Sequence, residues 1–230
     1  ALWTLLVLTG LRPGEALGLR WGDLDGERLA VRRALVRLTK GAWGLEEPKT
    51  GHGRTVTLPA PALKALTRHR ARQAETKLLL GTEYTAHGGL VFAATFGQPL
   101  RWENVVRRHF TPILARTAVR LAGLEVPEAP PEGASRAVRR AWITDCAAVE
   151  AKALAKTGLG RMRPYDLRHS AATLLLASGE HPKIVSELLG HAKVSLTLDT
   201  YSHVSPAMLD QAARRMEAIV GTKEPAVRSG

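Results

Sequence analysis

Five side chains that lie far apart in this sequence are of the types that carry out nucleophilic and acid–base chemistry. Arg12 stands just before an expected helix in TGLRPGEALGLRWGDLD, and Arg168 lies one turn into another in RPYDLRHSAAT. Lys49 lies on an expected hairpin in EPKTGHGRTVTLP, and LLGHAKVSLTLDTYSHV contains His191 and Tyr201. Guanidiniums bind phosphate oxygens, and an activated phenol is a nucleophile. The set therefore suits attack on a phosphodiester.

Tyr201 is the candidate nucleophile because its neighbours, Thr200, Ser202 and His203, are polar rather than part of an apolar stripe. A phenol with a pKa of about 10 is ionised to about one part in a thousand at pH 7, so it needs surroundings that favour the phenolate. Two guanidiniums supply that bias. They also stabilise charge that grows on the phosphoryl oxygens, where one preorganised donor is worth about 100- to 1000-fold in rate.

Each of these residues has an ordinary structural explanation when it is taken alone. Arg12 and Glu15 are spaced for an ion pair at a helix start, and His191 suits the first position after a helix that ends in glycine. Lys49 suits any polar hairpin, where Lys40 competes for its role. Folding alone does not require all of them in these contexts, so the set as a whole favours catalysis.

The charge of the chain indicates a polyanionic partner. Its net charge is +12, from 33 basic and 21 acidic residues, while 45% hydrophobic residues indicate a folded globular protein. Two expected helices carry arginines that would contact backbone phosphates of a nucleic acid. These are Arg68, Arg70, Arg72, Arg101, Arg107 and Arg108. A basic surface without a partner stays open as the alternative.

One cysteine, Cys146, leaves no disulfide framework and no thiolate cluster. The histidines lack partners at metal-ligand spacing, so we expect no metal. The apolar opening ALWTLLVLTG is too short to span a bilayer and has no basic residue ahead of it, so neither an anchor nor a signal peptide is expected. We expect a cytoplasmic protein with no membrane partner.

Glycine and proline positions divide the chain into mostly helical segments. We expect helices at 1–9, 13–20, 61–80, 101–121, 164–177, 181–189, 195–203 and 206–220. Residues 28–36, the segment before Lys49, and 54–59 are expected to form a three-stranded antiparallel sheet. The proline- and glutamate-rich break EVPEAPPEG opens a helical insertion at about 123–160, with Ser135 as the N-cap of its helix. Its basic patch of Arg136, Arg139 and Arg140 would touch DNA or a neighbouring subunit.

Four motifs occur in the order and spacing of the tyrosine recombinases, the phage integrase family: TGLRPGEALGLRW, PKTGHGRTVTLP, YDLRHSAAT and LGHAKVSLTLDTYSHV. The chain resembles that family over essentially its whole length outside 123–160. The resemblance implies a mainly α catalytic domain with a small three-stranded antiparallel β-sheet (α+β) over 1–221, followed by a flexible tail at 222–230. It also implies action on double-stranded DNA without metal, nucleotide or other cofactor.

The resemblance assigns roles to the matching residues. Arg12 and Arg168 would hold the non-bridging oxygens of the scissile phosphate, and Lys49 would protonate the leaving 5′ oxygen. Tyr201 would attack to give a 3′-phosphotyrosine link, which a 5′ hydroxyl of another strand can reverse without ATP. His191 matches the family's histidine after a leucine–glycine pair. Supporting roles fall to Glu15, which would buttress the first arginine, and to His169 and His203.

One position departs from the family pattern, because Tyr165 stands three residues before Arg168, where a histidine is usual. A tyrosine hydroxyl can donate to a phosphate oxygen, yet a phenol does not shuttle protons near neutrality as imidazole does. We therefore expect Tyr165 to position the phosphate. The departure keeps open a non-catalytic DNA-binding relative, and the shared chemistry keeps open a type IB topoisomerase-like enzyme.

The resemblance also bears on the larger assembly. The chain begins without methionine inside an expected helix, so we expect it to come from a longer protein. The family's N-terminal core-DNA-binding domain would then lie outside these 230 residues. The intact protein would work as a tetramer on two DNA duplexes, with 206–220 docking on a neighbour, and the isolated fragment would be a monomer.

Overall fold

The computed structural model is mainly helical with a small antiparallel sheet, and it describes residues 1–38, 42–47, 53–191, 193–195, 197, 214 and 216. The predicted roles of Lys49, Tyr201 and His203 fall outside the described residues. So do the tail at 222–230 and most of the predicted helices 195–203 and 206–220.

The predicted helices form close to their expected bounds, and glycines end several of them. Gly10 ends the first at a φ of 62°, and Gly190 ends the helix before His191 at a φ of 66°. The second helix stops at Leu17 rather than Arg20, because residues 21–23 tighten into a 3₁₀ turn. The helices are α1 Leu2–Thr9, α2 Pro13–Leu17, α3 Ala60–Leu80, α4 Trp102–Val105, a π-helical turn Val106–Phe110, α5 Thr111–Ala122, α6 Arg136–Thr157, α7 Asp166–Ala177 and α8 Pro182–Leu189.

The sheet differs in its strands from the prediction. The run 28–36 breaks at Arg32 and Arg33 into two strands, because its second half turns to pack against α2. The three-stranded sheet has the order β1-β2-β5, and the segment before Lys49 pairs in a separate hairpin, β3 with β4. All pairs are antiparallel. The strands are β1 Leu24–Asp25, β2 Arg28–Val31, β3 Ala34–Arg37, β4 Trp43–Glu46 and β5 Arg54–Thr57.

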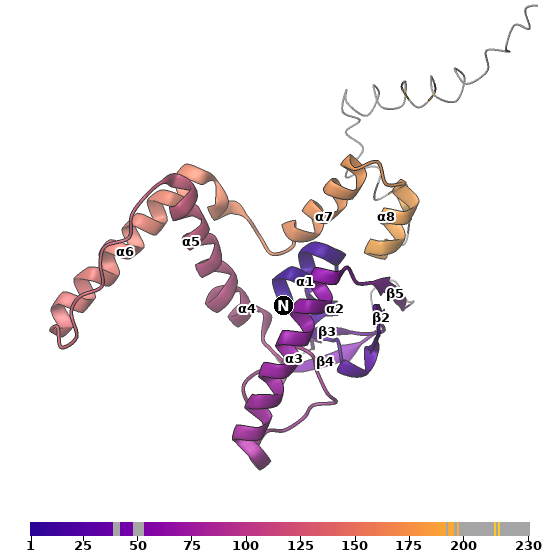
Figure 1. The fold of residues 1–230 in the computed structure, drawn as a ribbon, viewed down its shortest axis with the longest axis horizontal. Coiled ribbons are helices and arrows are strands. Elements are labelled where there is room, and N and C mark those ends of the chain that lie inside the picture. The colour runs from indigo at the N-terminus through magenta and orange to yellow at the C-terminus, as the bar shows by residue number, and fades with distance from the viewer. Residues whose placement is uncertain are drawn as a thin grey trace, which may run out of the picture.

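The main core lies between α1, α2, α3 and the inner face of the sheet (Figure 1). Leu5 and Leu6 of α1, Leu17 of α2 and Val56 of β5 are almost fully buried in it. Helix α7 packs on α1 and on α8, where Ala172 and Leu189 belong to a second cluster. Helix α1 thus packs against α2, α3 and α7, and its C-terminal end leads into the turn before α2.

Helices α5 and α6 form an arm that extends away from this body (Figure 1). Ser135 caps α6 as predicted, because its hydroxyl accepts from the Val138 N–H at 3.3 Å. The arm has a small core of its own, in which Ala118 and Ala153 are fully buried. None of the helices among the described residues has the length and apolar content to cross a membrane.

Candidate active site

The first element of the site is the turn between α1 and α2. Arg12 is the N-cap of α2, and Pro13 occupies the first helical position, where its missing N–H costs nothing. Glu15 folds back, so that its Oε2 accepts from the Arg12 backbone N–H and its Oε1 from Arg12 Nη1, both at 2.9 Å. Arg12 Nη2 donates to the Gly190 carbonyl at 3.2 Å. The predicted buttress of Arg12 by Glu15 is thus present in the geometry.

Glu15 is a buried carboxylate, with only 1% of its surface exposed. Burial by itself raises its pKa, but hydrogen bonds and charge from Arg54, and then from Arg12, hold the pKa below its ordinary value. The group is therefore an anion that the folded chain keeps away from water. An anion in such a place needs several donors around it.

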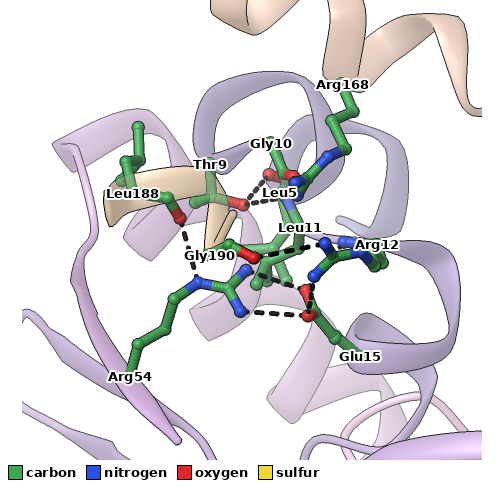
Figure 2. Close-up of polar contacts among 10 residues, drawn as sticks. All are labelled: Leu5, Thr9, Gly10, Leu11, Arg12, Glu15, Arg54, Arg168, Leu188 and Gly190. Carbon is green, nitrogen blue, oxygen red and sulfur yellow. Dashed lines mark hydrogen bonds and ion pairs between the residues drawn. The ribbon is translucent and has the colours of Figure 1, made fainter. Parts of the chain in front are cut away.

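Arg54 is a residue of the site that sequence reasoning missed. Its Nη1 and Nη2 donate to the two oxygens of Glu15 at 2.9 and 2.8 Å, and its Nε donates to the Leu188 carbonyl at 3.0 Å (Figure 2). The signal was available in RTVTLP, because strand alternation puts Arg54 on the same face as the buried Val56 and Leu58. An arginine on an inward face requires a buried acceptor.

Arg168 is the most deeply buried cation of the site, with 2% of its surface exposed. It lies in the first turn of α7, and its Nη1 donates to the Gly10 carbonyl at 2.6 Å (Figure 2). Its Nη2 is also buried and has no hydrogen-bond partner among the described residues. Burial, and next the positive charge of Arg12, lower the pKa of Arg168 to about 10, which leaves the guanidinium charged at neutral pH.

Gly10 lets α7 and α8 close on this turn. Its φ of 62° suits glycine, and a Cβ at Gly10 would lie 2.5 Å from a methyl of Leu189 and 3.9 Å from Arg168 Cγ. The Gly10 carbonyl can therefore reach the Arg168 guanidinium. The Gly10 carbonyl and the close approach of the helices at Gly10 therefore set the position of the Arg168 guanidinium.

His191 follows Gly190 at the end of α8, where the positive charges of the same cluster act on it. Its Nδ1 lies 2.8 Å from Oγ1 of the buried Thr197. Burial, and then the charges of Arg168 and Arg12, lower the pKa of His191 to about 4, so the imidazole is neutral at pH 7. A cavity of about 640 Å³ lies between β5 and α8, and its lining includes Arg54, Glu187 and His191.

Tyr165 stands at the N-cap of α7 and is 41% exposed. Its ring meets that of His169 edge-on, with centroids 5.0 Å apart. Its phenol raises the pKa of Arg168, against the larger lowering by burial and by Arg12, which indicates that the two side chains are close. The positioning role of Tyr165 stays a prediction.

The structure brings together four of the predicted site residues, Arg12, Glu15, Arg168 and His191, from three segments of the chain (Figure 2 labels all but the histidine). The arginines predicted to bind DNA are exposed on α3 and on the segment from α4 into the π-helical turn, and their role stays a prediction. They are Arg68, Arg72, Arg101, Arg107 and Arg108. Arg70 instead lies over the Trp21 ring at 5.2 Å.

The cluster of Arg12, Arg54 and Arg168 around Glu15 has the donors and the charge to bind a tetrahedral anion. The model of the Phage integrase family matches residues 1–208. The chain belongs to the phage integrase family. The predictions of family and fold class are therefore confirmed.

Two relatives show how much of a family member this chain represents. It is 31% identical over 219 residues to the tyrosine recombinase XerC-like protein of Caldanaerobacter subterraneus subsp. tengcongensis, covering 90% of this chain and 46% of that protein. It is 28% identical over 220 residues to the prophage integrase IntR of Escherichia coli (strain K12), covering 94% and 46%. The chain thus spans about half the length of the curated relatives it matches.

The fold of this phage integrase family member is similar to that of a solved integrase. The Tn1549 transposon integrase, in complex with a circular intermediate DNA, superposes with a TM-score of 0.58 at 20% identity. The match covers 93% of this chain and 57% of that one. At this identity the likeness establishes the shared fold.

Proposed function

We propose that this chain is the catalytic domain of a site-specific recombinase that cuts and rejoins double-stranded DNA through a tyrosine. The observation that carries the proposal is the buried Arg168, whose Nη2 lacks a partner among the described residues while Arg12 lies beside it. A buried guanidinium donor without an acceptor suits an anionic ligand. Family membership and the names of the relatives, which include recombinases and integrases, indicate that this anion is a DNA phosphate.

The arginines would bind the scissile phosphate by its non-bridging oxygens. Arg168 stays protonated, because its pKa of about 10 is well above neutrality. Its position is set by the Gly10 carbonyl and that of Arg12 by Glu15, so little reorganisation is needed when negative charge develops on the phosphorus oxygens. A preorganised donor of this kind is worth about 100- to 1000-fold in rate.

In the cleavage step, one bond to phosphorus forms and another breaks. The phenol oxygen of Tyr201 attacks the phosphorus, the bond from phosphorus to the 5′ oxygen breaks, and that oxygen takes a proton from Lys49. His191 is neutral at pH 7, so it can accept the phenol proton when its Nδ1–H donates to Thr197 and leaves Nε2 with a lone pair. Attack by the 5′ hydroxyl of another strand on the 3′-phosphotyrosine completes strand exchange. The proposed reaction consumes no ATP and uses no metal.

The expected DNA contacts and the assembly of the whole protein are part of the same proposal. The exposed arginines of α3, of the α4 N-cap and of the π-helical turn would bind DNA backbone phosphates, which gives affinity and salt sensitivity rather than sequence recognition. Recombination joins two duplexes, so the whole protein would assemble as a tetramer on DNA in the cytoplasm. Residues outside this chain would supply the rest of the DNA clamp, as the half-length matches suggest.

A covalent trapping assay with the complete gene product that contains this chain tests the proposal and identifies the target site at the same time. The probe is a library of duplexes with a random centre and a nick near it, from which the short 5′-hydroxyl fragment diffuses away after cleavage. We expect wild type to form denaturant-resistant adducts that converge on one sequence. Tyr201→Phe should form none and Arg168→Ala few, while Glu132→Ala, on the exposed loop before α6, should trap as wild type does.

Each alternative function predicts a different result in the trapping assay or with supercoiled plasmid. A type IB topoisomerase-like enzyme would relax supercoiled plasmid, and its adducts would show no preferred sequence. A non-catalytic relative would bind DNA yet give no adduct from folded wild type. Adducts that persist in Tyr201→Phe would mean that the nucleophile is another residue.

A further inference from the structure

Arg54 is the part of the site for which the family motifs assign no role. It opens β5, where it pairs with Val31 of β2, and its side chain shares the buried face of that strand. All three of its nitrogens donate inward, two to Glu15 and one to the Leu188 carbonyl (Figure 2). Its side chain is 12% exposed. The residue therefore ties β5 to α2 and to the end of α8 at the same time.

The geometry makes the position of Arg12 depend on Arg54. Each oxygen of Glu15 accepts one hydrogen bond from Arg54 and one from Arg12, so the carboxylate is held by two residues at a fixed angle. A fork-to-fork pair of this kind is directional as well as strong. Without Arg54, Glu15 is free to turn and form its own two-point pair with the Arg12 guanidinium. Arg12 Nη2 would then leave the Gly190 carbonyl, which it now contacts at 3.2 Å.

The charge of the cluster also indicates that Arg12 depends on Arg54. Three guanidiniums, Arg12, Arg54 and Arg168, surround one carboxylate, Glu15, so the cluster carries a net charge of +2. A phosphodiester carries one negative charge, and more develops on its oxygens as it is attacked. Because Arg54 neutralises Glu15, the charges of the other two arginines remain available to a phosphate. Loss of Arg54 halves the net charge and leaves Glu15 to neutralise Arg12.

We propose that Arg54 is a positioning residue for phosphoryl transfer, which holds Glu15 by both oxygens and α8 by the Leu188 carbonyl so that Arg12 faces the phosphate. This inference rests on the recombinase function proposed above. A purely structural ion pair would stabilise the fold equally well, so the test must separate orientation of Arg12 from stability.

The chain offers a matched control in a second ion pair with a buried carboxylate. Arg33 Nη1 donates to Asp23 Oδ2 at 2.6 Å, and the carboxylate is 3% exposed. Among the described residues, neither Arg33 nor Asp23 forms an ion pair with the cluster around Glu15. Arg33→Met therefore removes a comparable ion pair, and Arg54→Met removes the one that orients Arg12. Arg54→Lys keeps the charge but not the two-point geometry.

The first measurement is the rate of adduct formation at saturating DNA, with the complete gene product and the duplex selected above, at a temperature where circular dichroism shows every variant folded. We expect Arg54→Met to slow the step about 100-fold with DNA affinity changed far less, since a misplaced group commonly costs that much. Arg54→Lys should recover part of the rate, and Arg33→Met should keep the wild-type rate. A wild-type rate in Arg54→Met, or an equal loss in Arg33→Met, would overturn the inference.

The second measurement needs no catalysis, so it decides the inference even where wild type fails to trap and the recombinase proposal itself is wrong. Nitrogen-15 spectra of arginine side chains resolve the Nη signals of a guanidinium whose rotation is hindered by hydrogen bonds. We expect resolved Arg12 signals, identified by their loss in Arg12→Lys, in wild type and in Arg33→Met. In Arg54→Met they should stay resolved but move to new chemical shifts, because the Arg12 guanidinium then pairs with both oxygens of Glu15 and leaves the Gly190 carbonyl. Arg12 signals that keep their wild-type chemical shifts in Arg54→Met would show that Arg54 does not hold Arg12.

Discussion

The cluster around Glu15 and the α5–α6 arm use charge in opposite ways. In the cluster, Arg54 and Arg168 are largely removed from water, and their donors reach particular oxygens on α2, α8 and the turn after α1. On the arm, Arg136, Arg139 and Arg140 are exposed, and the buried contacts are between apolar side chains, mostly alanines. Buried charges need specific partners, whereas exposed ones are interchangeable at little cost.

Substitution should be more costly in the cluster around Glu15 than on the arm. Cluster residues from distant segments hold one another, so the loss of one partner leaves a charge buried and unpaired. The arm is held by a small apolar seam between two helices that are close in sequence, so its failure can stay local. Four experiments test this division, from the largest expected effect to the smallest.

Removal of Glu15 should have the largest effect on stability. Glu15→Ala leaves Arg12 and Arg54 without their shared acceptor, and the loss of one partner from a buried ionic group costs about 3–5 kcal/mol. Urea unfolding followed by circular dichroism measures the change. The control Glu132→Ala, on the exposed loop before α6, should change stability by less than about 0.5 kcal/mol. Equal effects would remove the distinction between the two regions.

Two glycines with the same backbone conformation allow a closer comparison. Gly190 has a φ of 66° and Gly123, at the end of α5, a φ of 64°. Alanine at either position costs about 1–2 kcal/mol for the left-handed conformation. At Gly190 its Cβ would also lie 2.7 Å from Arg54 Nη1, whereas at Gly123 it meets nothing within 4 Å.

The difference between Gly190→Ala and Gly123→Ala therefore reports the displaced Arg54 contact. Hydrogen bonds to charged groups are worth about 1.5–3 kcal/mol, so Gly190→Ala should be destabilised by about that much more. Chemical denaturation of both variants measures the difference. Identical losses would mean that Arg54 moves aside freely.

Overpacking of the arm should be smaller in effect and local. Ala118 is fully buried between α5 and α6, and Ala118→Leu should cost about 1–3 kcal/mol. Hydrogen exchange should quicken in α6 and stay unchanged in α1 and α7. Leu121→Gln, at a site that is 68% exposed on the same helix, is the control that should leave exchange unchanged. Faster exchange in α7 would show that the arm and body unfold together.

The pH dependence from His191 should be the smallest effect, because the imidazole is only partly buried and solvent weakens the stability change that its pKa shift produces. Its folded pKa of about 4 lies below the reference value of about 6.5, so the folded state binds fewer protons. The stability this contributes is fully present above about pH 6.5 and is lost as the pH falls towards 4. His191→Gln should flatten that loss in urea titrations from about pH 7.5 to about pH 4.5, while exposed His87→Gln should not. A steeper loss in His191→Gln would contradict the burial of a neutral imidazole.

Local sequence signals predicted the helices well, because capping and helix termination act within a few residues. Ser135 begins α6 and Gly10 ends α1 as expected. The sheet was predicted less well, since the break between β2 and β3 follows from packing against α2 rather than from strand propensity. The residue types that could act on a phosphate were likewise evident from Arg12, Arg168 and His191 in their motifs.

The family, the basic character and the candidate residues of this protein follow from its sequence, because motif order, charge and residue type are properties of the chain. The tertiary structure sets which charges share an acceptor, since Arg54 and Glu15 are 39 residues apart and meet across β5 and α2. It also decided that Arg168 is buried with Nη2 unpaired among the described residues. Strand alternation can indicate that a side chain such as Arg54 faces inward, but its partner depends on the packing of distant segments, which no local pattern encodes.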